Sequence, residues 1–211
     1  MAWGSKPMDA PTTRRSLLTR LVQGALVRLY RTKGWRITSE APVEGKYVIT
    51  GAPHTSNWDF IFFIGATYEL GIVPRFMGKH SLFRWPMRRF MLEMGGVPVV
   101  RSASHNYVDA MVAAFAAHDD FKLVVAPEGS RKSSGKWRSG FYHIALGAGV
   151  PVVPAWVCNK TMRGGLGAPI ALSGDYAADM AKIAAFYAAA LPGHPKLAAM
   201  LGDEAISSGP V

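Results

Sequence analysis

Short apolar runs alternate with longer amphipathic segments along most of the chain. Apolar runs bounded by turn residues predict strands at 35–38, 46–50, 73–77, 97–100, 121–126, 150–157 and 170–172. Apolar residues that recur at helical spacing predict helices at 16–31, 57–71, 84–94, 102–118, 141–148 and 176–191. Strands that alternate with helices are typical of an α/β protein, so we expect a single domain with a mostly parallel central sheet flanked by helices.

Three regions are expected along the chain. Residues 1–35 should form a tail and an amphipathic membrane-surface helix, residues 36–201 the folded domain, and residues 202–211 a loose tail. Prolines within 150–157 indicate a strand at the edge of the sheet, and 162–167 should be a flexible turn. No apolar stretch reaches the length of about 18 residues that a spanning helix requires, so no transmembrane span is predicted.

Basic residues outnumber acidic ones. The 211 residues include 24 Lys and Arg against 14 Asp and Glu, which gives a net charge of +10 at pH 7. This charge favours an anionic partner: a membrane surface, a phosphorylated substrate or a nucleic acid. The single cysteine, Cys158, excludes an intrachain disulfide and favours a reducing compartment.

Two predicted helices combine an apolar stripe with basic and aromatic residues. In the first, at 16–31, the arginines lie mainly off the stripe, and the second, at 84–94, interleaves arginines with aromatic residues. Both patterns suit a lipid surface, and the second also suits a nucleic acid. A helix that packs its stripe on the protein core explains each pattern as well. The residues assigned to a membrane surface are Arg20, Arg28, Arg31, Trp35, Arg84 and Trp85.

Polar residues follow three of the predicted strands. His54, Arg101 and Glu128 each come just after one of them. The carboxyl ends of parallel strands meet at one edge of a sheet, where sites form, so we expect these side chains to lie close together. Asp59 falls in the first turn of the next predicted helix, with Asn57 as its N-cap, where the helix dipole keeps a carboxylate ionised. A histidine steadied by a carboxylate can act as a general base.

Motifs of several other enzyme classes are missing. The sequence has no phosphate-binding glycine loop, no dinucleotide fingerprint, no zinc-type Cys/His spacing and no Gly-x-Ser-x-Gly elbow. We therefore expect no cofactor, no metal and no serine acyl-enzyme.

Four sequence blocks resemble, in order, the motifs of the glycerolipid acyltransferase family, which includes the bacterial lysophosphatidate acyltransferases. They are His54-Thr55-Ser56-Asn57-Trp58-Asp59, Gly96-Val97-Pro98-Val99-Val100-Arg101, Pro127-Glu128-Gly129-Ser130-Arg131 and Val150-Pro151-Val152-Val153-Pro154. A lone His-x4-Asp pattern is weak, but four blocks in the family's order are specific. The chain departs from the pattern at Pro53, where many members have Asn, and at Ser130, where the motif has Thr.

The resemblance implies an O-acyltransferase. Such an enzyme moves a fatty acyl group from acyl-CoA or acyl-carrier protein to the free hydroxyl of a lysophospholipid. The acceptor expected here is 1-acyl-glycerol-3-phosphate, which the reaction converts to phosphatidate. It implies His54 as the general base and Asp59 as the group that fixes the imidazole. A thioester is already activated, because its leaving thiolate is a weak base, so no acyl-enzyme is expected. The resemblance further assigns substrate phosphate binding to Arg101 and Arg131, to which Lys79 is added on its charge and position, and the acceptor pocket to Glu128, Gly129 and Ser130.

The expected partners are the acyl thioester donor, the lysophospholipid acceptor and an anionic membrane surface. The thioester is a co-substrate, carried by CoA or by an acyl carrier protein, and no nucleic acid is expected. The expected location is peripheral, on the cytoplasmic face of the inner membrane. Three alternatives stay open: the same chemistry on another lysolipid or hydroxyl acceptor such as an amino-acid lipid, a basic nucleic-acid-binding protein, and a non-catalytic lipid-surface protein.

Overall fold

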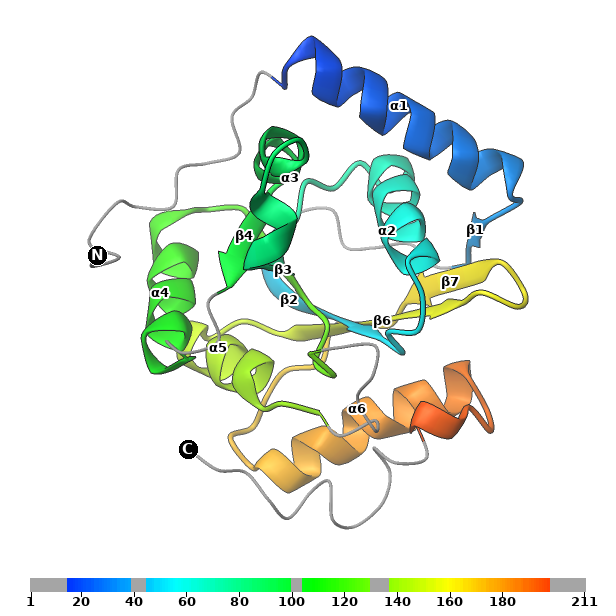
Figure 1. Cartoon of the computed structure of the whole chain (residues 1–211). Helices are drawn as coiled ribbons and strands as arrows, with labels where there is room; N and C mark the ends of the chain where they lie inside the picture. The colour runs from blue at the N-terminus through cyan, green and yellow to red at the C-terminus, as the bar shows by residue number, and fades with distance from the viewer. Residues whose placement is uncertain (1–14, 39–44, 100–103, 130–136, 198–211) are drawn as a thin grey trace.

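The computed structural model describes residues 15–38, 45–99, 104–129 and 137–197. The described strands form one 7-stranded sheet of order β1-β7-β6-β2-β5-β3-β4 (Figure 1). They are β1 (Arg36–Ile37), β2 (Lys46–Ala52), β3 (Arg75–Lys79), β4 (Gly96–Val99), β5 (Phe121–Val125), β6 (Val152–Cys158) and β7 (Arg163–Leu166).

Most of the sheet is parallel. β2 pairs in parallel with both β5 and β6, and β3 pairs in parallel with β4 and β5. β7 runs antiparallel to β6, and β1 is parallel to β7. The predicted α/β fold with a mostly parallel sheet is therefore confirmed.

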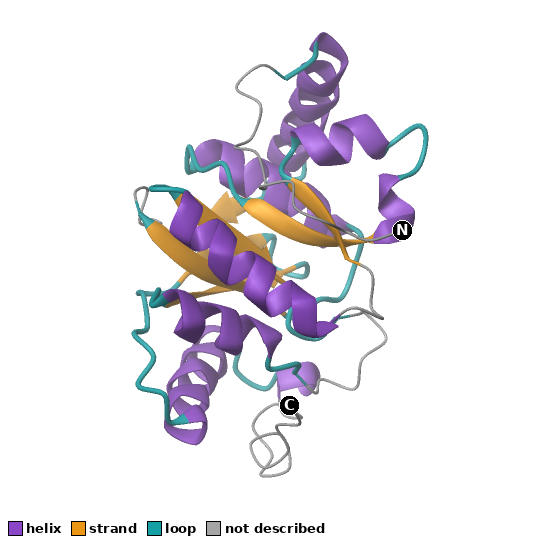
Figure 2. Cartoon of the chain, turned by 90° about the vertical axis from the view of Figure 1, so that its left-hand side faces the viewer, coloured by secondary structure: helices purple, strands orange, loops and turns teal. Residues whose placement is uncertain are grey.

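Helices cover both faces of the sheet, as Figures 1 and 2 show. One face carries α1 (Leu17–Thr32), α2 (Trp58–Glu69), the 3-10 helix η1 (His80–Phe83) and α3 (Arg88–Glu93). The other carries α4 (Ser104–Ala117), α5 (Gly140–Ala148) and α6 (Tyr176–Ala190). Along β2, Val48 belongs to the core under α4 to α6, whereas Tyr47 and Ile49 belong to a core cluster on the opposite face. The strand is buried on both faces, which explains its continuous apolar run.

The predicted N-terminal helix is present as α1, and its start is tied to the end of α3. The Ser16 hydroxyl accepts a hydrogen bond from the Thr19 N–H at 3.3 Å, which caps the helix. The Ser16 hydroxyl and N–H also donate to Glu93 Oε2, at 2.7 and 2.9 Å. The entry of the chain into α1 is thus held against α3. Of the helices in the described part of the chain, none combines the length and apolar character needed to cross a bilayer.

The apolar stripe of α1 is divided between the protein core and the surface. Val27 and Tyr30 are buried, and Gly65 of α2 makes room for the Tyr30 ring, since a β-carbon at Gly65 would overlap it. At the other end of the helix three leucines are exposed by 72%, 68% and 63%: Leu17, Leu18 and Leu21. The stripe therefore packs on the protein core toward the C-terminal end of α1 and is exposed at the N-terminal end, where a membrane-surface role stays a prediction.

Two predictions near the C-terminal half are wrong. The run at 150–157 forms an interior strand, because both prolines contribute their carbonyl groups to the hydrogen-bond ladder. Pro151 O accepts from Val48 N–H at 3.0 Å and Pro154 O from Gly167 N–H at 2.7 Å. The predicted turn at 162–167 is strand β7, hydrogen-bonded to β6.

Two further elements are shorter than predicted. The strand expected at 170–172 is reduced to a single bridge between Val152 and Ile170. The helix expected at 84–94 is limited to α3, which begins only after Pro86. Proline lacks the N–H that a helix interior uses, which accounts for the later start. The predicted tail at 202–211 lies outside the described residues.

Candidate active site

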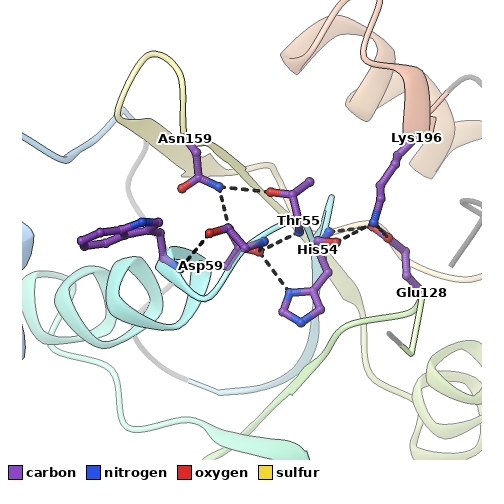
Figure 3. A network of polar contacts seen from close by, with 8 residues as sticks. His54, Thr55, Asp59, Glu128, Asn159 and Lys196 are labelled. Carbon is purple, nitrogen blue, oxygen red and sulfur yellow. Dashed lines mark hydrogen bonds and ion pairs between the residues drawn. The ribbon is translucent and has the colours of Figure 1, made fainter. Parts of the chain in front are cut away.

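The carboxyl ends of β2, β5 and β6 meet at one edge of the sheet. Because β2 is parallel to both neighbours, the segments that follow the three strands begin side by side. His54 follows β2, Glu128 follows β5 and Asn159 follows β6, and Figure 3 shows the three side chains in one polar network. This is the edge at which α/β proteins form sites. The expected convergence holds for His54 and Glu128, while Arg101 lies outside the described residues.

His54 and Asp59 are in direct contact. His54 Nδ1 lies 3.1 Å from Asp59 Oδ2, with the histidine side chain 34% exposed and the aspartate side chain 9% exposed. An ionised carboxylate can only accept hydrogen bonds, so Nδ1 carries the hydrogen of this contact, and in a neutral imidazole Nε2 is then the nitrogen that has the lone pair. A partly exposed imidazole in this tautomer can take a proton from a bound hydroxyl.

The Asp59 carboxylate is held by three further donors. Oδ2 accepts from the backbone N–H groups of Thr55 and Ser56, both at 2.8 Å, and Oδ1 accepts from Asn159 Nδ2 at 2.8 Å. Burial raises the pKa of Asp59, but the hydrogen bonds from His54, Ser56, Asn159 and Thr55 outweigh it and bring the pKa below its ordinary value. Asp59 is therefore ionised at neutral pH and fixed in orientation.

The turn before α2 delivers these donors. Asn57 occupies the predicted N-cap position, but its side chain makes no capping hydrogen bond. Ser56 Oγ instead accepts from the Trp58 N–H at 3.1 Å, while its own N–H faces Asp59. Because Asp59 lies in the first turn of α2, its carboxylate folds back onto the loop that carries His54.

Glu128 and Lys196 hold the backbone of His54. Glu128 Oε1 accepts from the His54 N–H at 2.7 Å, and its Oε2 lies 2.9 Å from Lys196 Nζ. Lys196 Nζ also donates to the His54 carbonyl at 2.7 Å. The Glu128 side chain is only 1% exposed. Both of its oxygens are thus bonded inside the protein, to the His54 N–H and to Lys196, while its assignment to the acceptor pocket stays a prediction.

The remaining residues assigned to substrate binding are placed only in part. Lys79 is exposed at the end of β3, two strands away from β2 in the sheet. Gly129 follows Glu128 with a φ of +67°, in the left-handed region. Ser130 and Arg131, like Arg101, lie outside the described residues. Within the described ranges, no three His, Cys, Asp or Glu side chains come together as a metal site would require.

Of the six residues assigned to a membrane surface, one is buried and five are exposed. Trp35 is a wrong assignment: it is only 4% exposed and its ring packs against Phe62, with ring centroids 4.9 Å apart. A buried indole that packs against an aromatic ring of α2 is part of the core. Trp85, in contrast, is 92% exposed. The four assigned arginines are all exposed: Arg20, Arg28, Arg31 and Arg84.

Two residues of the network were missed by the sequence analysis. Asn159 carried the same signal as Glu128, a polar residue directly after a predicted strand, and that signal could have found it. It also donates to Thr55 Oγ1 at 3.1 Å, so one amide group steadies the loop as well as Asp59. Lys196 lies beyond α6, in a helical stretch that begins at residue 195, and no pattern in the sequence connects it with His54.

With this geometry established, comparison with known proteins defines the class. Residues 35–158 match the family model described as Acyltransferase, and this match covers more than half of the chain. The chain therefore belongs to the acyltransferase family, as the four sequence blocks indicated. The matched range includes His54, Asp59 and Glu128 but ends before Asn159 and Lys196.

A more particular relative is the 1-acyl-sn-glycerol-3-phosphate acyltransferase of Haemophilus influenzae. It is 27% identical over 146 residues, a match that covers 64% of this chain and 58% of the relative. The chain thus matches little more than half of that protein's length. No solved structure matches the chain. The family match favours the acyl-transfer hypothesis over the nucleic-acid alternative.

Proposed function

We propose that this protein transfers a fatty acyl group from a thioester to the free hydroxyl of a lysophospholipid, with 1-acyl-glycerol-3-phosphate as the preferred acceptor. The observation that carries the proposal is the 3.1 Å contact between His54 and Asp59, inside the range that matches the family. The name of the Haemophilus influenzae relative, a 1-acyl-sn-glycerol-3-phosphate acyltransferase, supports the choice of acceptor.

In the proposed reaction His54 acts as a general base. Nε2 takes the proton of the acceptor hydroxyl as the hydroxyl oxygen attacks the thioester carbonyl carbon. Asp59 stabilises the imidazolium, and the tetrahedral intermediate then collapses with cleavage of the carbon–sulfur bond. The proton passes to the departing thiolate, so the products are the acylated lipid and a free thiol. General-base assistance of this kind contributes about 100- to 10,000-fold.

The acceptor phosphate requires cations near this edge of the sheet. Arg101 and Arg131 take this role from the family resemblance, and Lys79 from its place at the end of β3. Arg138 is a further candidate, because its Nε lies so near Gly129 that a β-carbon there would approach it to 3.0 Å. Arginine forms paired hydrogen bonds with phosphate oxygens, while lysine supplies a mobile positive charge.

The test is a product assay. Purified protein in mixed vesicles is given lysophosphatidate with acyl-CoA or acyl-carrier protein, and phosphatidate and free thiol are quantified. His54→Ala should lower the rate by about 100- to 10,000-fold, whereas His143→Ala, at an exposed position on α5, should leave it unchanged. Full activity in His54→Ala refutes the mechanism. Turnover of a different lysolipid, with none of lysophosphatidate, refutes the acceptor and keeps the reaction type.

The proposal includes peripheral docking on an anionic membrane. The supporting observation is an exposed apolar surface on two segments that Glu93 joins, the start of α1 and the η1–α3 region. Exposed arginines adjoin both segments in the chain. Apolar side chains among cations suit the boundary between lipid headgroups and acyl chains. The apolar residues are Leu17, Leu18, Leu21, Leu82, Trp85, Met87 and Leu92.

Vesicle flotation tests this docking. Leu21→Ser should weaken binding to vesicles that contain phosphatidylglycerol by about tenfold, since a buried leucine contributes roughly 1.5–3 kcal/mol. Leu146→Ser is the matched control, because Leu146 is 41% exposed but lies on α5, in the opposite helix layer. Equal binding of the two variants, or equal binding to neutral vesicles, contradicts the proposed surface.

A further inference from the structure

Lys196 joins a distant part of the chain to the loop that carries His54. It lies in the segment after α6, outside the range that matches the family. Its ammonium group donates to the His54 carbonyl at 2.7 Å and to Glu128 Oε2 at 2.9 Å. The Lys196 side chain is only 21% exposed, so both bonds are largely shielded from water.

Together these bonds close a ring around one peptide segment. Glu128 accepts from the His54 N–H at 2.7 Å, Lys196 donates to the His54 carbonyl, and the two side chains bind each other. Both backbone polar groups of His54 are therefore satisfied by ionised side chains, which make the stronger class of hydrogen bond. Asp59 fixes the imidazole, and the charged side chains of Glu128 and Lys196 fix the backbone from which the imidazole extends.

Removal of the Lys196 ammonium disturbs this arrangement in two ways. The His54 carbonyl loses its donor, and the Glu128 carboxylate, with its side chain 1% exposed, is left without its partner cation. If Glu128 moves toward solvent to relieve that buried charge, the His54 N–H that it binds moves with it. A displacement of about 1 Å at a catalytic group can lower a rate by about 100-fold.

We propose that Lys196 is a positioning residue for His54, acting through the His54 carbonyl and through Glu128. The inference rests on the proposed role of His54 as the base of acyl transfer. Lys196 touches neither substrate in this scheme. It sets the direction of the imidazole, so its loss should lower kcat and leave KM for both substrates nearly unchanged.

The kinetic test uses three variants. Lys196→Met should lower kcat by about 10- to 100-fold, and Lys196→Arg should restore most of it because the guanidinium keeps charge and donors. Lys46→Met is the matched control, since Lys46 begins β2 at the end of the strand remote from His54. A higher KM with kcat intact, or equal loss in the Arg variant, overturns the assignment.

A double variant separates positioning from loss of fold. Glu128→Gln keeps an acceptor for the His54 N–H but removes the buried charge. Added to Lys196→Met, it should recover thermal stability, because the Glu128 carboxylate that lost its cation is replaced by a neutral amide. The kcat should stay low, because the His54 carbonyl still lacks the donor that Lys196 supplied. If thermal stability and kcat both return to the values of Glu128→Gln alone, the contact between Lys196 and the His54 carbonyl has no role in positioning.

Nitrogen NMR of the imidazole gives a readout that does not depend on turnover. The His54 signals, assigned by their loss in His54→Ala, should report the Nδ1–H tautomer in the unmodified protein and a mixture in Lys196→Met. An unchanged tautomer overturns the inference. If the tautomer shifts but no acyl transfer is found with any donor, the proposed function fails and the positioning role of Lys196 stands.

Discussion

Asp59→Asn removes one negative charge and little else. In the native site Oδ2 accepts from His54 and two backbone N–H groups, and Oδ1 accepts from Asn159. An asparagine can direct its oxygen to the first three donors and its amide to Asn159. The Asn159 amide can turn to match, because its buried Oδ1 has no hydrogen-bond partner among the residues that the structure describes. The variant should therefore fold with the loop intact.

The magnitude follows from the separation of the charges. With Nδ1 and Oδ2 3.1 Å apart, the centres of the imidazolium and carboxylate charges lie about 4 Å apart, for which Coulomb's law gives about 4 kcal/mol at an effective dielectric constant of about 20. His54 is 34% exposed, and solvent screening reduces this to about 2–4 kcal/mol. Each 1.36 kcal/mol is about tenfold, so kcat should fall by about 30- to 1,000-fold.

The assay is initial-rate thiol release at saturating thioester and lysolipid, with thermal unfolding measured on the same preparation. We expect a lower kcat, a nearly unchanged KM and a melting temperature close to that of the unmodified protein. A loss smaller than about threefold refutes the reasoning, because the Asp59 charge then does not stabilise the imidazolium in the transition state. A large loss of melting temperature refutes the premise that Asn159 can adapt.

Four other variants test the packing and the hydrogen bonds. Asn159→Ala should lower kcat by about tenfold, since Asp59 loses a charge-assisted hydrogen bond of about 1.5 kcal/mol. Gly65→Ala should lower the unfolding free energy by about 1–3 kcal/mol by displacing Tyr30, while Gly24→Ala, with nothing within 4 Å, should raise it by up to about 1 kcal/mol. Burial raises the pKa of Asp179, but hydrogen bonds outweigh it and lower the pKa from 3.8 to about 2. Its stabilising contribution is therefore complete above pH 3.8 and lost as the pH falls toward 2, so the stability deficit of Asp179→Asn, measured by denaturant titration, should shrink over that range.

The elements that the sequence predicts well are those with strong local patterns. The mostly apolar runs of β2 and β5 reflect burial on both faces, and α6 carries a clear apolar stripe. The failures lie where a partner decides the outcome. Nothing local distinguishes a proline that ends a strand from Pro154, whose carbonyl accepts a hydrogen bond from Gly167, the residue directly after the neighbouring strand β7. The glycines of β7 suggested a turn, because only the pairing with β6 makes this segment a strand.

The site shows a similar division. The His54–Asp59 contact is local, so the spacing of the two residues was enough to predict it. Glu128 was found, because it follows a strand, but its role was not, since that role depends on how deeply the carboxylate is buried. Lys196 could not be found at all: it lies 142 positions after His54 in the chain, and a contact between residues so far apart in sequence leaves no local pattern.

The order in which the site residues are made has a consequence for the growing chain. Once residue 159 has been synthesised, β2 has both of its sheet neighbours, β5 and β6, and every partner of the Asp59 carboxylate exists. Lys196 follows only after a further interval of about 2–7 s, at synthesis rates of about 5–20 residues per second. The hydrogen bonds from Glu128 and Lys196 around His54 are therefore the last part of the site to form. A nascent chain has the exposed apolar residues of α1 and of the η1–α3 region before the backbone of His54 is held in place.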